Sequence, residues 1–311
     1  MIFCGVPTGH SLFFMRCERI VFMRVLTYTI TTEHDGMTVQ DYLRQVHGYS
    51  RRILTRLKQT RGDILLDGNH IRMVDVIQIG DVINIKLYEE TYITPNDSLT
   101  VPIAYEDQDI IIYNKPANMP VHPSRNHQSD TLANVFCYHM LQSGVEATFR
   151  PINRLDRDTS GLCVIAKNAL AASKISGNLN KEYTAIVCGR VSPLSGTIDA
   201  PIVRLDDFYI QRAVREDGQR AVTHYKVEYQ NEKYSLVRIR LETGRTHQIR
   251  VHFSYLGYPL AGDDMYCGSM DDINRQALCC NQVDFLHPIT NEQVKICINI
   301  HEDMQKLIQN E

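Results

Sequence analysis

The spacing of apolar and polar positions divides the chain into two blocks with different predicted elements. In the first block, residues 24–90, the pattern predicts a strand, two helices, a hairpin and a closing strand. Asp67 and Gly68 form a tight-turn signal between two apolar runs, and residues 82–87 alternate as a strand. The helices are predicted from caps and apolar spacing: Thr38, Val39, Tyr42, Leu43 and Val46 for the first, and Ser50, Ile53, Leu54 and Leu57 for the second.

The second block, residues 101–311, is rich in strands with helices between them. Residues 246–256 predict a helix that ends at Gly257, because glycine is the usual residue after a helix. Strands are predicted from apolar or alternating runs at residues 110–113, 162–166, 183–187 and 234–241. This pattern is typical of an α+β fold with a mainly antiparallel sheet.

Two connecting segments complete the predicted organisation. Residues 91–100 form a polar linker, where both helical and strand periodicity lapse. Residues 1–23 are expected to be a disordered leader, because the apolar run at residues 12–15 is too short to span a bilayer and no cleavage site follows it. The catalytic or binding chemistry should therefore lie in residues 24–90 or 101–311.

Composition excludes a strongly basic protein and an oxidised, secreted one. The net charge is −3, and nine cysteines are scattered without a signal peptide ahead of them. We therefore expect a reduced, cytoplasmic protein that is not bound to a membrane. Any surface for nucleic acid must be local rather than global.

One such local surface is predicted in the first block. Residues 37–72 contain seven Lys and Arg residues and three Asp residues, a balance of +4. Four of these cations lie on the second predicted helix: Arg51, Arg52, Arg56 and Lys58. A positive helix face suits a phosphate backbone, although an ordinary solvated helix surface gives the same pattern.

Two polar segments carry candidate chemistry. In residues 154–162, Asp156 and Asp158 stand among arginines, which favour an ionised carboxylate able to act as a nucleophile or base; a surface turn held by ion pairs is the alternative. In residues 244–252, Arg250 could reach a carboxylate elsewhere, whereas the histidines do not share a helix face. No metal site is expected, and phosphate-loop, nucleophile-elbow and dinucleotide motifs are absent, so no cofactor is predicted.

These segments resemble the RluA-type pseudouridine synthases. Residues 24–90 also resemble the small RNA-binding domain that many members carry ahead of the catalytic domain, and the resemblance covers roughly residues 24–310. The matching motifs occur in the expected order: Asn114-Lys115-Pro116, Pro120-Val121-His122-Pro123, Arg154-Leu155-Asp156-x-x-Thr159-Ser160-Gly161-Leu162, Lys181-Glu182-Tyr183, Ala221-Val222-Thr223-His224-Tyr225, Gly244-Arg245-Thr246-His247-Gln248-Ile249-Arg250-Val251-His252, Gly257-x-Pro259-Leu260-x-Gly262-Asp263 and Phe285-x-His287-Pro288.

The resemblance implies a role for each matched residue. Asp156 would be the catalytic aspartate, Arg250 would pair with it, and Tyr183 would lie against an extruded uracil. Arg154 would fill the space that the base leaves in the RNA, and Asp158 would fix the loop. The implied fold has a mixed central sheet with flanking helices and a small tethered domain. The implied reaction isomerises uridine without a cofactor.

The resemblance also implies a partner and leaves alternatives open. Structured RNA is expected, with large-subunit (23S) ribosomal RNA first and transfer RNA second. No obligate protein partner is expected, and a monomer is favoured. A catalytically silent RNA-binding or ribosome-assembly factor is the main alternative; an aspartate-based glycosidase is less well matched, because it needs two carboxylates across a sugar.

Two departures from the family pattern stand out. Asn153 occupies a position where members often have His, and Cys279-Cys280 replaces a common His-Ala pair. Asn keeps hydrogen-bonding ability, and the cysteines are expected in a buried packing region. Neither departure is expected to abolish activity.

Overall fold

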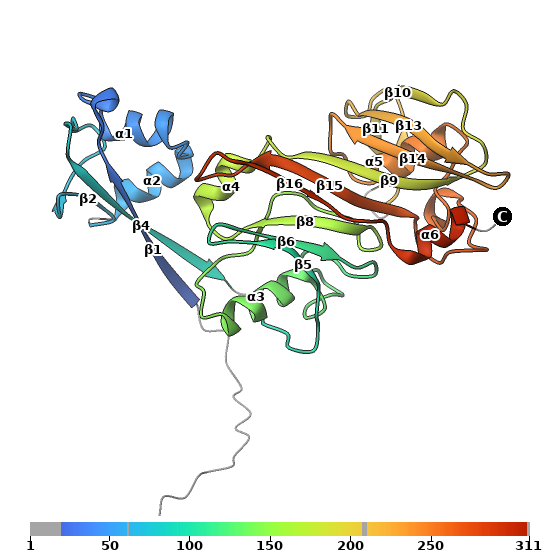
Figure 1. The fold of residues 1–311 in the computed structure, drawn as a ribbon, viewed down its shortest axis with the longest axis horizontal. Helices are drawn as coiled ribbons and strands as arrows, with labels where there is room; N and C mark the ends of the chain where they lie inside the picture. The colour runs from blue at the N-terminus through green and yellow to red at the C-terminus, as the bar shows by residue number, and fades with distance from the viewer. Residues whose placement is uncertain (1–19, 61, 92, 207–209, 310–311) are drawn as a thin grey trace, which may run out of the picture.

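A computed structural model describes residues 20–309 except residues 61, 92 and 207–209, in two parts that lie side by side (Figure 1). Most of the predicted leader, residues 1–19, lies outside the described residues. The first strand, β1, begins at Ile20, before the predicted start of the small domain. The chain then forms the small domain and continues into the larger strand-rich domain.

The small domain is a four-stranded antiparallel sheet, in the order β1-β4-β2-β3, within the described residues. Asp67 and Gly68 both adopt positive φ angles, as the predicted hairpin turn requires. The first predicted helix is a short α-helix that continues as a π-helical turn, whereas the second is regular. The elements are β1 (Ile20–Thr29), η1 (Thr32–His34), α1 (Val39–Asp41), η2 (Tyr42–Val46), α2 (Arg51–Gln59), β2 (Ile64–Leu66), β3 (Asn69–His70) and β4 (Val82–Thr91).

The small domain packs directly on α4 (Ala169–Ile175) of the larger domain. Leu170 is 1% exposed and belongs to the hydrophobic core of the small domain. Ser173 donates a hydrogen bond to the carbonyl of Gly48 at 3.3 Å, and the stem of Lys174 lies over the same glycine. The sequence predicted a polar linker and a tethered small domain, and it did not predict this contact.

The larger domain, within its described residues, is built on a ten-stranded sheet whose main path is β10-β13-β14-β9-β15-β8-β6-β5. The strands of the larger domain are β5 (Ile103–Glu106), β6 (Ile110–Lys115), β7 (Arg150–Pro151), β8 (Ser160–Ala166), β9 (Asn180–Cys188), β10 (Ser195–Asp199), β11 (Ile202–Arg204), β12 (Arg212–Val214), β13 (Val222–Gln230), β14 (Tyr234–Leu241), β15 (Leu278–Leu286) and β16 (Gln293–Cys297). Of these, β11 and β12 pair only with each other, in a separate two-stranded sheet. Its helices are α3 (Leu132–Gln142), α4, α5 (Gln248–Tyr255), η3 (Asp264–Tyr266) and α6 (Glu302–Gln309).

The sheet is mixed because β8 and β15 pair in parallel, while the other strand pairs recorded for it are antiparallel. Every residue of β8 is buried, as its continuous apolar run predicts for a central strand covered on both faces. This confirms the predicted α+β class. The junction of β8, β15 and β9 lies at the middle of the sheet, and the site described below is built on it.

The predicted helix at residues 246–256 is shorter in the structure. Helix α5 begins at Gln248, because His247 adopts a left-handed conformation with a φ of 57° that ends any helix on its amino-terminal side. Gly257, with a φ of 82°, follows the helix as predicted. No helix in the described part of the chain combines the length and apolar character that crossing a bilayer demands.

Candidate active site

Asp156 lies on the loop that joins β7 to β8. A turn closes this loop, in which the backbone N–H of Thr159 donates to the Asp156 carbonyl at 3.1 Å. Asn153 is buried and fastens the loop to β8, since its side chain donates to Leu162 and accepts from Val164. The hydrogen bonds expected of Asn153 are therefore present, and they fix where the loop enters the strand.

Lys115 fixes the same loop by hydrogen bonds to backbone carbonyls. Its ammonium group is fully buried and donates to the carbonyls of Pro116, Met119 and Arg157 at 2.7, 2.8 and 3.0 Å. Burial lowers the pKa of Lys115 to about 8, since these partners are carbonyl groups and supply no full negative charge. The carbonyl of Arg157, next to Asp156, thus has a fixed partner.

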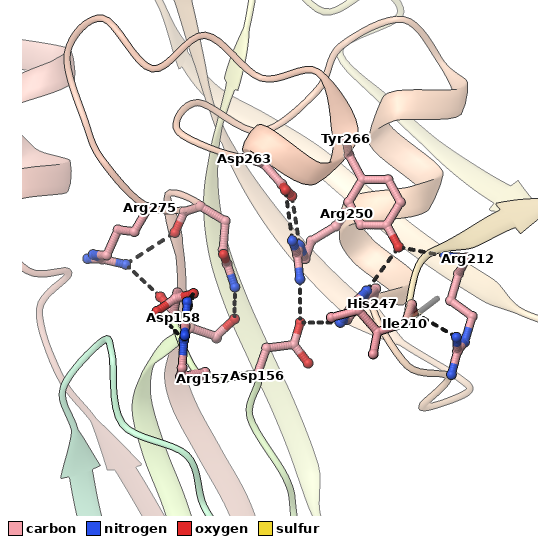
Figure 2. Close-up of polar contacts among 12 residues, drawn as sticks. Asp156, Arg157, Asp158, Ile210, Arg212, His247, Arg250, Asp263, Tyr266 and Arg275 are labelled. Carbon is pink, nitrogen blue, oxygen red and sulfur yellow. Dashed lines mark hydrogen bonds and ion pairs between the residues drawn. The ribbon is translucent and has the colours of Figure 1, made fainter. Parts of the chain in front are cut away.

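Arg275 holds the far side of the loop. It donates to the carbonyl of Asp158 at 3.3 Å (Figure 2). It also forms a two-fold ion pair with Asp303 on α6. The Asp158 side chain pairs with Arg157 at 3.0 Å instead of entering the pocket. Asp158 therefore occupies a position consistent with fixing the loop.

The loop can enter the sheet only because residue 161 is glycine. Gly161 has a φ of 109°, and a Cβ atom there would lie 2.3 Å from the Cys280 carbonyl oxygen. Cys280 is fully buried, which agrees with the expected packing region, but it also lies directly opposite Tyr183 on β9. One of the two residues that depart from the family pattern, Cys280, therefore lies beside Tyr183, which lines the pocket.

Arg250 links Asp156 to a second, fully buried carboxylate (Figure 2). Its Nη1 donates to Asp156 Oδ2 at 3.3 Å, while Nε and Nη2 donate to the two oxygens of Asp263 at 2.7 and 2.8 Å. The Tyr266 ring lies 5.0 Å from the guanidinium carbon. Burial alone would lower the pKa of Arg250, but hydrogen bonding and charge from Asp263, and then Asp156, raise it above its ordinary value.

Tyr183 forms an apolar wall beside Asp156. It is 7% exposed, and burial raises the pKa of its hydroxyl well above the ordinary value, with further contributions from Cys280 and Asp156. The phenol therefore remains neutral at physiological pH. An aromatic ring in this position offers a surface against which a flat base can stack.

A pocket of about 380 Å³, open to solvent, lies above these residues. An adjoining hollow shares Arg154, Asp156, Tyr183 and Arg245 with it and adds His122 and Lys181. The pocket is lined by Arg154, Leu155, Asp156, Thr159, Tyr183, Leu241, Arg245, His247, Gln248, Ile249, Arg250 and Leu278. The predicted residues Asp156, Tyr183, Arg250 and Arg154 thus lie in one pocket, and Arg154 is exposed at its rim.

The predicted cations of the small domain lie elsewhere, on α2. Arg51, Arg52, Arg56 and Lys58 are all exposed, and Lys58 donates to Gln40 at 2.8 Å. None of them lines the pocket that contains Asp156. They form a second candidate contact surface, separate from the pocket that contains Asp156.

Sequence reasoning missed three residues of the site. Asp263 was noticed only as part of a motif, and neither His247 nor Tyr266 was given a role. The available signal was two short polar segments, one just before Gln248 and the other just after Gly262. It could not show that Asp263 meets Arg250, because that contact depends on the packing of η3 on α5.

A group of possible metal ligands lies apart from this pocket: Asp107, Asp109 and His287. His287 Nδ1 accepts hydrogen bonds from the backbone N–H groups of Ile289 and Thr290, so the proton of a neutral ring lies on Nε2. That Nε2–H donates to Asp107 at 2.9 Å. A nitrogen that carries a proton has no lone pair for a metal. These contacts therefore stabilise the turn that follows β15.

The loop that carries Asp156 enters β8, and Arg250 meets it from α5, so both side chains line one pocket. The chain belongs to the RNA pseudouridylate synthase family, whose sequence profile matches residues 109–255. Among its relatives is YjbO, an uncharacterized RNA pseudouridine synthase of Bacillus subtilis (strain 168), which is 42% identical over 282 residues, 88% of this chain and 99% of that protein.

Further relatives agree with this assignment. The ribosomal large subunit pseudouridine synthase D of Vibrio vulnificus (strain CMCP6) is 33% identical over 307 residues, which cover 91% of this chain and 93% of that protein. The solved structure of human RNA pseudouridylate synthase domain containing 1 matches with a TM-score of 0.54 and 26% identity. That match covers 67% of this chain and 86% of the human one.

Proposed function

We propose that the chain isomerises specific uridines to pseudouridine in structured RNA, with large-subunit (23S) ribosomal RNA as its substrate and Asp156 as the catalytic carboxylate. The observation that carries this proposal is the contact of Arg250 Nη1 with Asp156 Oδ2 at 3.3 Å, in a pocket walled by Tyr183. The choice of RNA is supported by relatives named as ribosomal large subunit pseudouridine synthases.

The chemistry needs an ionised carboxylate beside the ribose of the target nucleotide. Arg250 places a positive charge 3.3 Å from Oδ2 of Asp156. Asp156 then acts on the sugar, as a nucleophile or as a base, while the bond between ribose C1′ and uracil N1 breaks. The base turns, a bond forms between C1′ and uracil C5, and the C5 proton leaves as N1 gains one. The product is an isomer, so the reaction consumes neither an oxidant nor a cosubstrate.

The target base must leave its stack to reach Asp156, because the carboxylate is only 29% exposed in the RNA-free pocket. We assign Tyr183 to the wall against which the extruded uracil lies. We assign Arg154, which is exposed at the rim, to the gap that the base leaves in the RNA. Extrusion costs a few kcal/mol, which contacts to the RNA backbone must offset.

Those backbone contacts have two proposed sources. The hollow beside the pocket is lined by basic side chains, including Arg154, Lys181 and Arg245, which suit phosphates near the target. The exposed cations of α2 would bind a more distant part of the same RNA. We therefore assign residues 24–90 to RNA binding and residues 101–311 to catalysis, with residues 91–100 as the connection.

The deciding experiment maps pseudouridine in 23S ribosomal RNA and transfer RNA after incubation with the purified chain or with Asp156→Ala. Carbodiimide labelling and reverse transcription should give new stops in 23S RNA with the wild type alone. Asp156→Asn serves as a matched control, because it keeps the shape of the side chain and removes its charge. Stops with Asp156→Ala would overturn the assignment of the catalytic residue.

The alternative of a catalytically silent RNA-binding or assembly factor predicts a different result. Wild type and Asp156→Ala would then bind RNA equally, and neither would produce stops. Mapping the RNA of cells that lack the gene separates this outcome from a missing substrate. A site lost in those cells and restored by the wild-type chain alone would support the enzyme.

A further inference from the structure

Two donors approach the same oxygen of Asp156, and one of them is His247. Arg250 Nη1 lies 3.3 Å from Asp156 Oδ2, and His247 Nε2 lies 3.9 Å from that same atom (Figure 2). The second distance is longer than a hydrogen bond. Contacts of this kind are often loose in a substrate-free enzyme and tighten when the substrate binds. Oδ1 has no hydrogen-bond partner among the described residues, and in Figure 2 the contacts from both donors end on Oδ2.

The partners of Tyr266 determine which nitrogen of His247 carries the proton. The phenol oxygen of Tyr266 accepts the backbone N–H of Arg212 at 2.9 Å and lies 2.9 Å from His247 Nδ1. Burial raises the pKa of Tyr266, so the phenol keeps its proton. Among the described residues, His247 Nδ1 is the acceptor within reach of that proton. An Nδ1 that accepts leaves the proton of a neutral ring on Nε2, facing Asp156.

Burial also lowers the pKa of His247, with opposing contributions from its neighbours Asp156 and Arg250. The ring is therefore neutral near pH 7, which the tautomer argument requires. Four charged groups act on the ring: Asp156 from the loop between β7 and β8, Arg250 from α5, Asp263 next to η3 and Arg212 from β12. Among these, Asp156 is the group that Nε2 approaches.

The backbone of His247 gives an independent indication of function. Its φ of 57° lies in the left-handed region, which non-glycine residues rarely adopt. Such conformations persist where the surrounding structure imposes them, and they gather at functional sites. Here the conformation directs the imidazole into the pocket, where the side chain is 9% exposed. Asn or Gly would suit the turn better if it served the backbone alone.

We propose that His247 is a positioning residue that acts with Arg250 on Oδ2 of Asp156, so that Oδ1 is the oxygen that reacts with the target nucleotide. This inference rests on the proposed function of Asp156. Tyr266 orients His247, as Asp263 orients Arg250. Asp156 is thereby held through one oxygen by two donors of different kinds, a guanidinium and a neutral imidazole.

The tautomer can be measured without RNA. In the full chain labelled with ¹⁵N-histidine, the signals of His247 are assigned by their loss in His247→Gln. The expected state at pH 7 is a neutral ring with its proton on Nε2, and Tyr266→Phe should lower the fraction of that tautomer. A proton on Nδ1 of the neutral ring, or an imidazolium at pH 7, would overturn the proposal.

The kinetic test compares three substitutions that separate a donor from a structural residue. His247→Asn suits the left-handed backbone but is too short to reach Asp156, whereas His247→Gln can place an amide N–H near the position of Nε2. We expect His247→Ala and His247→Asn to slow single-turnover isomerisation by about 10²-fold at saturating RNA. His247→Gln should recover part of the rate, and RNA affinity should stay near the wild-type value.

A residue that serves only the turn would give the opposite order, with His247→Asn near wild type and His247→Gln impaired. Tyr266→Phe should slow the step less than His247→Ala, and the double variant should be no slower than His247→Ala, because the tyrosine acts through the histidine. Additive losses would contradict this order of action. If the wild type modified no RNA, the proposed function would fail, while the ¹⁵N measurement would still decide the state of His247.

Discussion

At the scale of the residue, the position of Arg250 depends on a carboxylate that does not line the pocket. Asp263 is fully buried and binds Arg250 through two hydrogen bonds, so the guanidinium has a single orientation. Asp263→Asn leaves that guanidinium with a neutral partner. We expect a loss of about 3 kcal/mol in the free energy of unfolding and at least about 10²-fold in single-turnover rate.

Urea unfolding and rapid-quench kinetics measure these two losses. Asp217→Asn is the matched control, since Asp217 pairs with Arg215 on the surface and should tolerate the change without measurable effect. A variant with normal stability and a normal rate would show that Arg250 does not need Asp263 to hold its position.

A second residue-scale prediction concerns pH and the small domain. His47 stacks on Tyr28 with ring centroids 3.9 Å apart, and burial, then the charge of Lys174, lowers its pKa from 6.5 to about 4. The unfolded chain therefore takes up this proton more readily than the folded one. The stabilising contribution of neutral His47 is complete above pH 6.5 and is lost as the pH falls from 6.5 toward 4.

Because His47 is only partly buried, we discount its shift for solvent screening and expect a loss of about 1 kcal/mol between pH 7 and pH 5. Urea unfolding of the wild type and of His47→Phe at both pH values isolates this contribution, because phenylalanine keeps the stacking and does not titrate. Equal pH dependence in the two proteins would show that His47 titrates normally.

At the scale of the element, regular strands were the part of the fold that periodicity predicted well. The alternation at residues 234–241 gave β14 with its observed bounds, because one face of that strand packs and the other faces solvent. The π-helical turn at Tyr42–Val46 was missed, since apolar residues at helical spacing do not distinguish the two helix types. The start of α5 was missed because the left-handed angle of His247 has no apolar signature.

Helix α2 carries the prediction at this scale. Its basic face is exposed, so a charge reversal there should weaken RNA binding without altering the pocket. We expect Arg52→Glu to raise the dissociation constant by about tenfold at low salt and to reduce the salt dependence of binding, with the single-turnover rate at saturating RNA unchanged.

Lys306→Glu makes the same charge change on α6, which Figure 1 shows at the opposite end of the molecule, and it should leave RNA affinity unchanged. Filter binding across a series of salt concentrations measures the dissociation constant and its salt dependence for each variant. Equal effects of the two substitutions would indicate a response to net charge and would argue against α2 as an RNA-binding surface.

At the scale of the whole molecule, the site is assembled from segments that the sequence alone could name but not bring together. Asp156 and Arg250 were assigned through a resemblance, and the fold places them in contact across 94 positions of chain. Asp263 and Tyr266 acquire roles only through the packing of η3 against α5. Composition and periodicity contain no information on such contacts, which is why the second carboxylate and the orienting tyrosine were not predicted.

The contact between the two domains is the other feature that depends on the whole molecule. Leu170 leaves the larger domain and enters the core of the small one, so it fixes α2 relative to the pocket. An RNA that contacts both surfaces then binds two domains whose relative position is already fixed. Binding therefore carries no entropy cost for bringing the domains together. Leu170→Asp should separate the domains and raise the RNA concentration for half-maximal rate by about tenfold, because the linker still tethers them.

The rate at saturating RNA should stay near the wild-type value, which would also show that the pocket remains folded. Small-angle X-ray scattering should report a larger radius of gyration for Leu170→Asp. Leu141→Asp, at a position on α3 that is 63% exposed, makes the same chemical change and should alter neither quantity. If the two variants behaved alike, α2 would bind RNA independently of its placement on α4, and affinity would come from the tether alone.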